Sequence, residues 1–125
     1  MIISALKSSL DSDLRSPIHI DTVNTLTNLG AEIFFEEGIG DGINVGDDIF
    51  EESGLKKCSR ENCLKKGDLI ITNQPLEDAE LKLIRSDSTL LGMVNPFNNH
   101  SLIESCANFK INLVSMEFIP RITRA

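Results

Sequence analysis

Short apolar runs alternate with amphipathic stretches along the chain of 125 residues. Between residues 20 and 29 an apolar side chain recurs at every third position, which places these side chains on one side of a helix. Gly30 follows directly and is a typical helix terminator, because glycine adopts positive φ without a Cβ clash. Residues 68–72 form instead a compact apolar run, which is typical of a strand buried on both faces.

The same patterns predict strands and helices over the rest of the chain. The predicted strands lie near residues 2–6, 31–36, 68–72, 89–94 and 111–116. The predicted helices lie near residues 20–29, 47–53, 60–66, 77–85 and 98–108. Because parallel neighbours need crossover connections, the alternation predicts one α/β domain over residues 1–125, three-layered and flavodoxin-like or Rossmann-like. We expect about five mostly parallel strands with helices on both faces.

A ligand of such a sheet binds in the crevice beyond the carboxyl ends of its strands. The predicted strand ends bring residues 7–17, 72–76 and 95–99 to this edge, together with the segment after Met116. These segments are therefore the candidate site.

The charge balance narrows the classes of partner. The net charge is −7, from 19 acidic and 12 basic residues, so binding to nucleic acid or to an anionic membrane surface is not expected. The acidic residues between positions 36 and 52 are interpreted as a solvated edge rather than a metal site. No apolar run approaches the roughly 20 residues that span a bilayer, so direct membrane insertion is not expected either.

Cysteines and histidines offer no recognisable catalytic or metal-binding pattern. Cys58, Cys63 and Cys106 are odd in number, and the first residues lack the features of a secretory signal, which favours reduced thiols in the cytoplasm. Their spacing does not fit a zinc site. His19 and His100 are isolated, and capping or surface roles are expected for both.

The glycine-rich segment at residues 38–42 invites comparison with a dinucleotide phosphate loop. Ile43 stands where the third glycine of that loop is expected, and the acidic residues around the segment would repel phosphate. We therefore interpret the segment as a plain turn that uses the conformational freedom of glycine.

Two arginine positions are candidates for binding an anion. Arg15 follows the first predicted strand, where a guanidinium could bind a carboxylate or phosphate through two parallel hydrogen bonds. Arg121 and Arg124 follow Pro120 directly after the last strand, in a segment that is too apolar for an ordinary solvated tail.

Residues 115–125, SMEFIPRITRA, resemble the signature that ends the first lobe of domain I in the alpha subunit of proton-translocating NAD(P) transhydrogenases. That subunit belongs to the alanine dehydrogenase/pyridine nucleotide transhydrogenase family. The similarity extends in the correct order through residues 21–30, 36–40, 47–54 and 95–99.

The resemblance places Arg15 at an arginine that both groups of the family carry after the first strand, and which holds the substrate carboxylate in alanine dehydrogenases. The preceding family stretch, glycine-glutamate-arginine, is replaced here by residues 12–14, Ser-Asp-Leu. The substrate lysine and catalytic histidine of alanine dehydrogenases would fall at Thr72 and Asn95. Neither side chain can replace them, because threonine carries no charge and asparagine does not exchange a proton near neutral pH. Amino-acid dehydrogenation is therefore disfavoured.

The resemblance implies hydride transfer between NAD(H) and NADP(H), coupled to proton translocation. This chain would form one wall of the NAD(H) cleft and place Arg121 beside the nicotinamide ring. The glutamine and aspartate that accompany this arginine in the family, and the NAD-binding Rossmann lobe, would come after Ala125 and are absent from these 125 residues. We therefore expect NAD(H) binding only together with that lobe, and no cofactor, no complete catalytic site and no activity for the chain alone.

The resemblance also implies partners. They are the remaining transhydrogenase domains or subunits: the NAD-binding lobe, the membrane domain and the NADP-binding domain. A homodimer is compatible with the sequence as well, and the expected location is the cytoplasm, peripheral to the inner membrane through partner subunits. Two other interpretations stay open, namely a truncated remnant without catalysis and a stand-alone module that binds a small anion or a protein.

Overall fold

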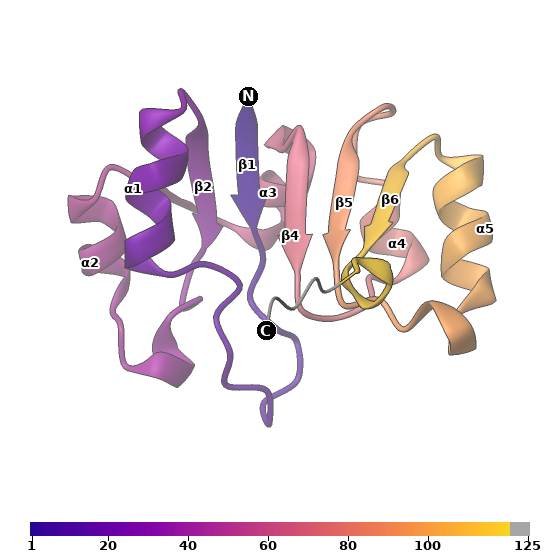
Figure 1. Ribbon diagram of the computed structural model, residues 1–125, viewed down its shortest axis with the longest axis horizontal. Coiled ribbons are helices and arrows are strands. Elements are labelled where there is room, and N and C mark those ends of the chain that lie inside the picture. Colours follow the sequence, from indigo (N-terminus) through magenta and orange to yellow (C-terminus); the bar gives the residue numbers. More distant parts are fainter. Residues whose placement is uncertain (121–125) are drawn as a thin grey trace.

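The computed structural model describes residues 1–120, and in this part of the chain six strands form one sheet (Figure 1). The strands are Ile2–Ala5 (β1), Glu32–Glu36 (β2), Lys56–Cys58 (β3), Leu69–Thr72 (β4), Thr89–Gly92 (β5) and Asn112–Ser115 (β6). Their order is β3-β2-β1-β4-β5-β6, and all neighbouring pairs are parallel. The α/β fold is confirmed, with one strand more than expected.

The additional strand is β3, at one edge of the sheet. It has three residues, and its two lysines are exposed. Lys56 Nζ lies 2.6 Å from Glu32 Oε1 on the neighbouring strand. Sequence reasoning missed this strand because it has no apolar alternation, which an edge strand protected by lysines does not need.

The five predicted helices are all present. They are Ile20–Asn28 (α1), Asp47–Glu52 (α2), Arg60–Lys66 (α3), Asp78–Leu81 (α4) and His100–Asn108 (α5). Single 3-10 turns cover Asp41–Ile43, Pro96–Asn98 and Met116–Phe118. His19 caps α1, as expected, by accepting a hydrogen bond from the backbone of Asp21. Helix α4 is shorter than predicted, because Leu83 and Ile84 bond to the carbonyl groups three residues earlier.

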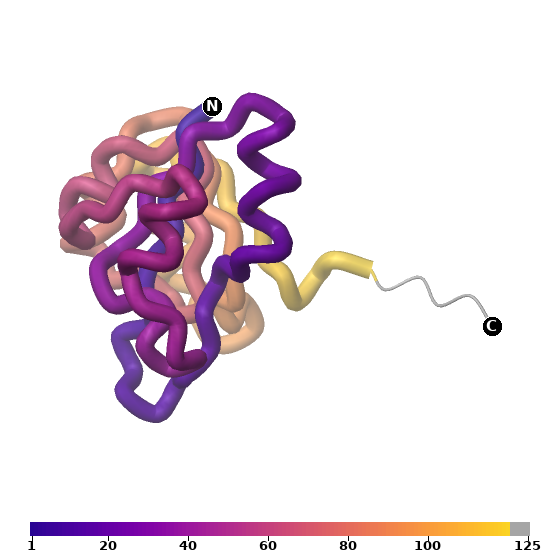
Figure 2. Tube along the Cα trace, turned by 90° about the vertical axis from the view of Figure 1, so that its left-hand side faces the viewer, coloured from indigo at the N-terminus to yellow at the C-terminus, as the bar shows by residue number. Residues whose placement is uncertain are grey.

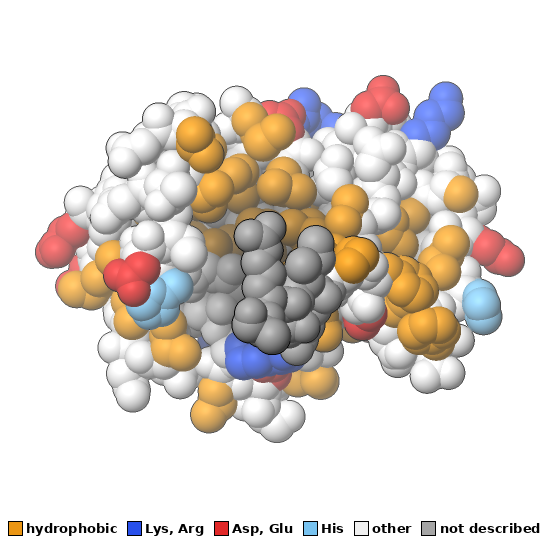
Figure 3. Space-filling model, in the orientation of Figure 1, with side chains coloured by type: hydrophobic (Ala, Val, Ile, Leu, Met, Phe, Trp, Pro, Cys, Tyr) orange, Lys and Arg blue, Asp and Glu red, His pale blue; other side chains and the backbone are white. Residues whose placement is uncertain are grey.

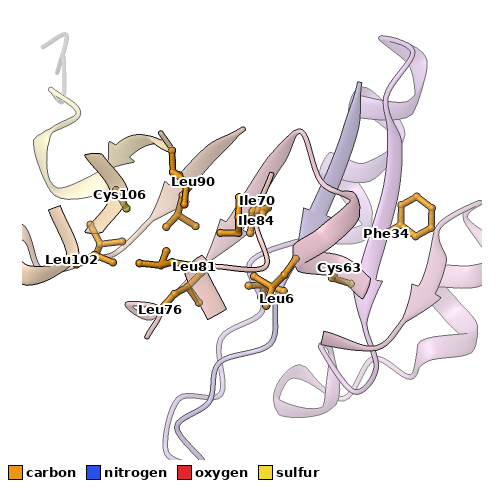
Figure 4. Packing of buried hydrophobic residues seen from close by; sticks show 13 residues of the cluster. Leu6, Phe34, Cys63, Ile70, Leu76, Leu81, Ile84, Leu90, Leu102 and Cys106 are labelled. Atoms are coloured by element: carbon orange, nitrogen blue, oxygen red, sulfur yellow. The ribbon is translucent and has the colours of Figure 1, made fainter. Parts of the chain in front are cut away.

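Helices cover the two faces of the sheet unequally. Helices α1 and α2 pack on the front face in Figure 1, where Phe35 of β2 meets Phe50 of α2 at a ring separation of 5.4 Å. Helices α3, α4 and α5 pack on the back face. Figure 4 shows the back cluster, in which Leu81 and Leu102 converge on Leu90 of β5. The front helices lie over β1–β3, whereas the back helices span the sheet.

The strand order has its switch point between the neighbouring strands β1 and β4, because the chain turns back across the sheet after β3. From β1 it moves outward through β2 to β3, and from β4 it moves the other way to β6. In open parallel sheets, ligands bind at such a switch point, beyond the carboxyl ends of the strands. The predicted site segments therefore lie at the edge of the sheet where this fold places a ligand.

Candidate functional site

The carboxyl edge of the sheet brings together the loops that follow β1, β4, β5 and β6. A hollow of about 260 Å³ lies there, and its lining includes Pro17 after β1, Thr72 and Gly92 at the ends of β4 and β5, and Met116 after β6. Gly92 is needed at this point, because a Cβ would collide with the carbonyl oxygen of Thr72. The structure therefore brings two of the four expected segments to one cavity, together with Met116, the residue that precedes a third.

Arg15 lies at this edge, but its charge is already paired. Its Nε and Nη2 donate to the two carboxylate oxygens of Asp13 at 2.9 and 3.0 Å, and Gln74 Nε2 donates to the same carboxylate at 2.8 Å. The hydrogen bond from Arg15, followed by that from Gln74, holds the pKa of Asp13 well below its usual range. The guanidinium binds a carboxylate through two hydrogen bonds, as its chemistry allows, and that carboxylate belongs to its own loop.

The same loop is attached to the end of β4. Asn73 Nδ2 donates to the carbonyl oxygen of Arg15 at 3.3 Å. The loop also packs on the glycine-rich segment, because a Cβ on Gly42 would collide with the backbone of Leu14. Gly38 adopts a φ of +80°. These glycines therefore serve a turn and a close backbone approach, which confirms the interpretation of residues 38–42 as a turn.

Arg60 forms a second ionic cluster, which sequence reasoning missed. Its Nε donates to Glu80 Oε2 at 2.6 Å, and its Nη1 donates to Glu36 Oε2 at 2.9 Å and to the carbonyl oxygen of Lys7 at 2.9 Å. Glu36 also accepts a 2.7 Å hydrogen bond from the backbone N–H of Lys7. The Glu36 side chain is only 16% exposed, so the expectation of a wholly solvated acidic edge is wrong for this residue. Arg60 links the ends of β1 and β2 to α4.

Glu117 holds the chain where it leaves β6. Its carboxylate accepts hydrogen bonds from the backbone N–H groups of Val94 and Asn95, at 3.3 and 2.7 Å, and from Ser115 Oγ at 2.8 Å. Burial acts to raise the pKa of Glu117. Hydrogen bonds from Ser115 and from the backbone of Asn95 outweigh burial and lower the pKa. Glu117 therefore joins two of the segments that carry the family resemblance, although nothing in the sequence paired them.

Thr72 and Asn95 supply no titrating group at the edge. Thr72 is buried, and its hydroxyl donates to the carbonyl oxygen of Gln74 at 2.8 Å. Asn95 has left-handed backbone geometry, with a φ of 50°, at the exit from β5. Arg121, the other residue predicted to contact the cofactor, lies outside the described residues.

The loop after β1 lacks the glycines of a pyrophosphate-binding turn. Residues 6–19, which connect β1 to α1, contain no glycine, whereas a pyrophosphate-binding turn at this position needs several. A hollow of about 380 Å³ on the back side is lined by Glu77 and Asp78 and by no basic side chain. Within residues 1–120, no helix has the length and apolarity to span a membrane.

A family model described as "Alanine dehydrogenase/PNT, N-terminal domain" matches residues 7–125. The chain belongs to this family. The residues that match the alanine dehydrogenase/PNT N-terminal domain family include all of the loops at the carboxyl edge described above.

In sequence, this family member is similar to transhydrogenase alpha subunits. The chain is 28% identical over 130 residues to the first part of NAD(P) transhydrogenase subunit alpha of Rickettsia prowazekii, covering 100% of this chain and 34% of the relative. It is 26% identical over 126 residues to NAD(P) transhydrogenase subunit alpha of Cereibacter sphaeroides, covering 100% of this chain and 24% of the relative. The chain thus spans about a third or less of the length of the curated relatives it matches.

Solved structures agree with this assignment. The transhydrogenase from Sinorhizobium meliloti matches with a TM-score of 0.92 at 25% identity, over 98% of this chain and 37% of that chain. An L-alanine dehydrogenase matches with a TM-score of 0.84 at 19% identity, over 92% of this chain and 32% of that chain. The second likeness shows the fold alone.

Proposed function

We propose that this chain is the N-terminal portion of an NAD(P) transhydrogenase alpha subunit and forms one wall of the NAD(H) cleft. In the assembled enzyme, hydride passes between NAD(H) and NADP(H) and is coupled to proton translocation. The cofactor supplies the hydride chemistry, and the protein positions the cofactor. The chain alone is inactive.

The observation that carries this proposal is the match along the full chain to transhydrogenase alpha subunits. The match covers only about a third or less of those relatives, so most of each relative lies outside the segment that this chain represents. The described residues also lack a pyrophosphate-binding turn after β1, which supports the assignment of NAD(H) binding to a separate Rossmann lobe.

Arg121 is the residue of this chain that we propose beside the nicotinamide ring. Three hydrogen bonds to Glu117 hold the chain in place just before it. Arg15 is proposed as a weaker contact, because an anionic ligand would have to compete with Asp13 for its guanidinium. NAD(H) then binds only when the NAD-binding lobe is present.

The proposed partners are the NAD-binding lobe, the membrane domain and the NADP-binding domain. Their assembly would hold this chain in the cytoplasm, peripheral to the inner membrane.

Titration of the purified chain with NADH tests the proposal, followed by titration of the chain fused to the unmatched remainder of the Rickettsia prowazekii relative. We expect no saturable binding in the micromolar range by the chain alone and saturable binding by the fusion. With the NADP-binding domain added to the fusion, Arg121→Ala should slow hydride transfer at least about tenfold, because a charged donor aimed at the reacting region is lost.

Arg85→Ala is the matched control, because Arg85 pairs with Asp68 at the opposite edge of the sheet. It should leave hydride transfer unchanged. Micromolar NADH binding by the chain alone would contradict the proposal. A fusion that folds and binds no NADH would favour the truncated remnant instead.

A further inference from the structure

The topology leaves half of one sheet face without a covering helix. Strand–helix–strand crossovers are right-handed almost without exception, so the direction of travel decides the face on which each helix lies. The two connections that run from β1 to β3 place α1 and α2 on the front. The three that run from β3 to β6 place α3, α4 and α5 on the back. No crossover helix of the described chain can therefore cover the front of β4, β5 and β6.

This uncovered surface is apolar. The register places Ile71, Leu91 and Val114 side by side across the three strands, and Met93 and Met116 continue the surface toward the carboxyl edge. We call these five residues the bare face. Val114, Met93 and Met116 are 40%, 38% and 44% exposed. Figure 3 shows hydrophobic side chains gathered in the middle of this side of the molecule, beside the part that α1 covers.

The bare face has a defined limit at its other end. Thr89 and Asn112, the neighbours one row nearer the amino ends of the strands, are polar. On β5 and β6 the apolar surface is therefore confined to the carboxyl half of the strands, whereas on β4 it continues to Leu69, which packs against the front cluster. Four of the five bare-face residues, all except Val114, line the hollow between β4 and β5. Parallel sheets are normally covered by helices on both faces, because their strands are apolar on both sides. A helix is thus the element that completes this layer.

The last described residues indicate where the covering helix comes from. Met116 and Ile119 line one hollow together with Met93 and Pro120, so the chain leaves β6 along the rim of the bare face. Figure 2 shows this final segment, up to residue 120, projecting from the body on the side that carries α1. A second copy laid on this surface would meet the projecting segment. In the relatives, by contrast, the matched family is an N-terminal domain, so the remaining polypeptide follows it.

We propose that the bare face binds an amphipathic α-helix supplied by the polypeptide that follows this domain in the transhydrogenase relatives. The proposal rests on the proposed function and names the surface through which the two parts join. The helix packs its apolar stripe across Leu91 and Val114 and closes the front layer beside the cofactor cleft. Burial of the apolar side chains provides the driving force.

Cysteine labelling in a matched pair of variants tests this proposal. Val114→Cys places a thiol on the bare face, and Ile103→Cys places one on α5, and both native residues are 40% exposed. Each variant is labelled with a maleimide, as the chain alone and as the fusion to the Rickettsia prowazekii remainder, and the labelled peptides are located by mass spectrometry. We expect labelling at position 114 to slow at least tenfold in the fusion, and labelling at position 103 to stay unchanged.

Equal labelling of position 114 in the chain and the fusion would overturn the proposal. Protection of position 114 in the chain alone that increases with protein concentration would also overturn it, because the occupant would then be a second copy. Met116→Cys provides the same readout if the strand does not tolerate a change at Val114. A mixture of the chain with the separate remainder provides it if the fusion does not fold.

NADH titration of the same fusion separates this proposal from the proposed function. Protection at position 114 without NADH binding would leave the docking surface standing and remove the proposed function. NADH binding with position 114 still freely labelled would remove the docking surface alone.

Discussion

The two halves of the sheet are built from similar strands but are covered differently. In β2, the consecutive residues Phe34 and Phe35 are both buried, one on each face. In β5, Leu90 is fully buried on the back, whereas Leu91 on the front is only partly covered. The difference arises from the order in which the chain visits the strands, because that order sends every later helix to the back face. Strand composition alone therefore does not show which apolar residues are finally buried.

The largest expected difference between the halves is in the cost of truncating a front side chain. Phe35→Ala should lower the free energy of unfolding by about 3–5 kcal/mol, because it leaves a cavity against Phe50. Leu91→Ala should cost about 1 kcal/mol, since this side chain is only partly removed from water. Urea denaturation of both variants measures the two values. If Leu91→Ala costs as much as Phe35→Ala, the front of the second half is covered in the isolated chain, and the comparison fails.

The second prediction concerns the link between the halves. Arg60 joins Glu36, at the end of β2, to Glu80 on α4, which packs behind the other half. Arg60→Met should lower the free energy of unfolding by about 1–3 kcal/mol, because it leaves a largely buried carboxylate without its cation. Thermal and urea denaturation report the change.

Lys65→Met is the matched control for Arg60→Met. Lys65 lies on the same helix and pairs with Glu61 one turn away, but both side chains are well exposed, so its loss should hardly change stability. Equal effects of the two variants would show that Arg60 contributes no more than an ordinary surface ion pair.

A third prediction tests the exit from the uncovered half. Glu117→Gln should lower the free energy of unfolding at pH 7 by at most about 1 kcal/mol, because Glu117 as a whole is an exposed residue. Since the folded-state pKa of Glu117 is lowered, its contribution is present above the ordinary value of about 4.3 and is lost as the pH falls through the folded value. Urea denaturation at pH 7 and pH 3 should therefore give a smaller difference between variant and wild type at pH 3. A difference that stays constant with pH would show that the charge of Glu117 is irrelevant.

The smallest stability effect is expected on the bare face itself. Val114→Asp and Ile103→Asp should each change the free energy of unfolding by less than about 1 kcal/mol, because both side chains are already substantially exposed. A dye that binds exposed apolar surface, such as ANS, should bind less to Val114→Asp than to wild type. Binding to Ile103→Asp should be unchanged. Equal dye binding by both variants would mean that the bare face is not the main apolar surface of the isolated chain.

Much of the fold could be predicted because apolar spacing reports burial directly. The three-residue spacing before Gly30 and the apolar runs of β2, β4 and β5 each identified an element correctly. Strand β3 has only two lysines and a cysteine, so its place in the sheet depends on pairing with β2, which apolar spacing does not reveal.

The candidate site was less predictable, because its contacts join residues far apart in the sequence. The location of Arg15 at the carboxyl edge followed from strand order. Its capture by Asp13 depends on loop geometry, and the contact of Glu117 with the backbone of Asn95 depends on how β5 and β6 end side by side. Backbone N–H groups carry no sequence signal, so the role of Glu117 became visible only in the structure.

The two outer strands of the sheet differ in how their unpaired edges meet solvent. The edge of β3 carries Lys56 and Lys57, whereas β6, with the sequence Asn-Leu-Val-Ser, has no charged side chain. Lysines at an edge discourage the addition of a foreign strand, and an uncharged edge does not. Any unwanted growth of this sheet, as in aggregation at high concentration, should therefore proceed from β6, and a lysine placed on that strand should be the simplest way to keep the isolated chain in solution.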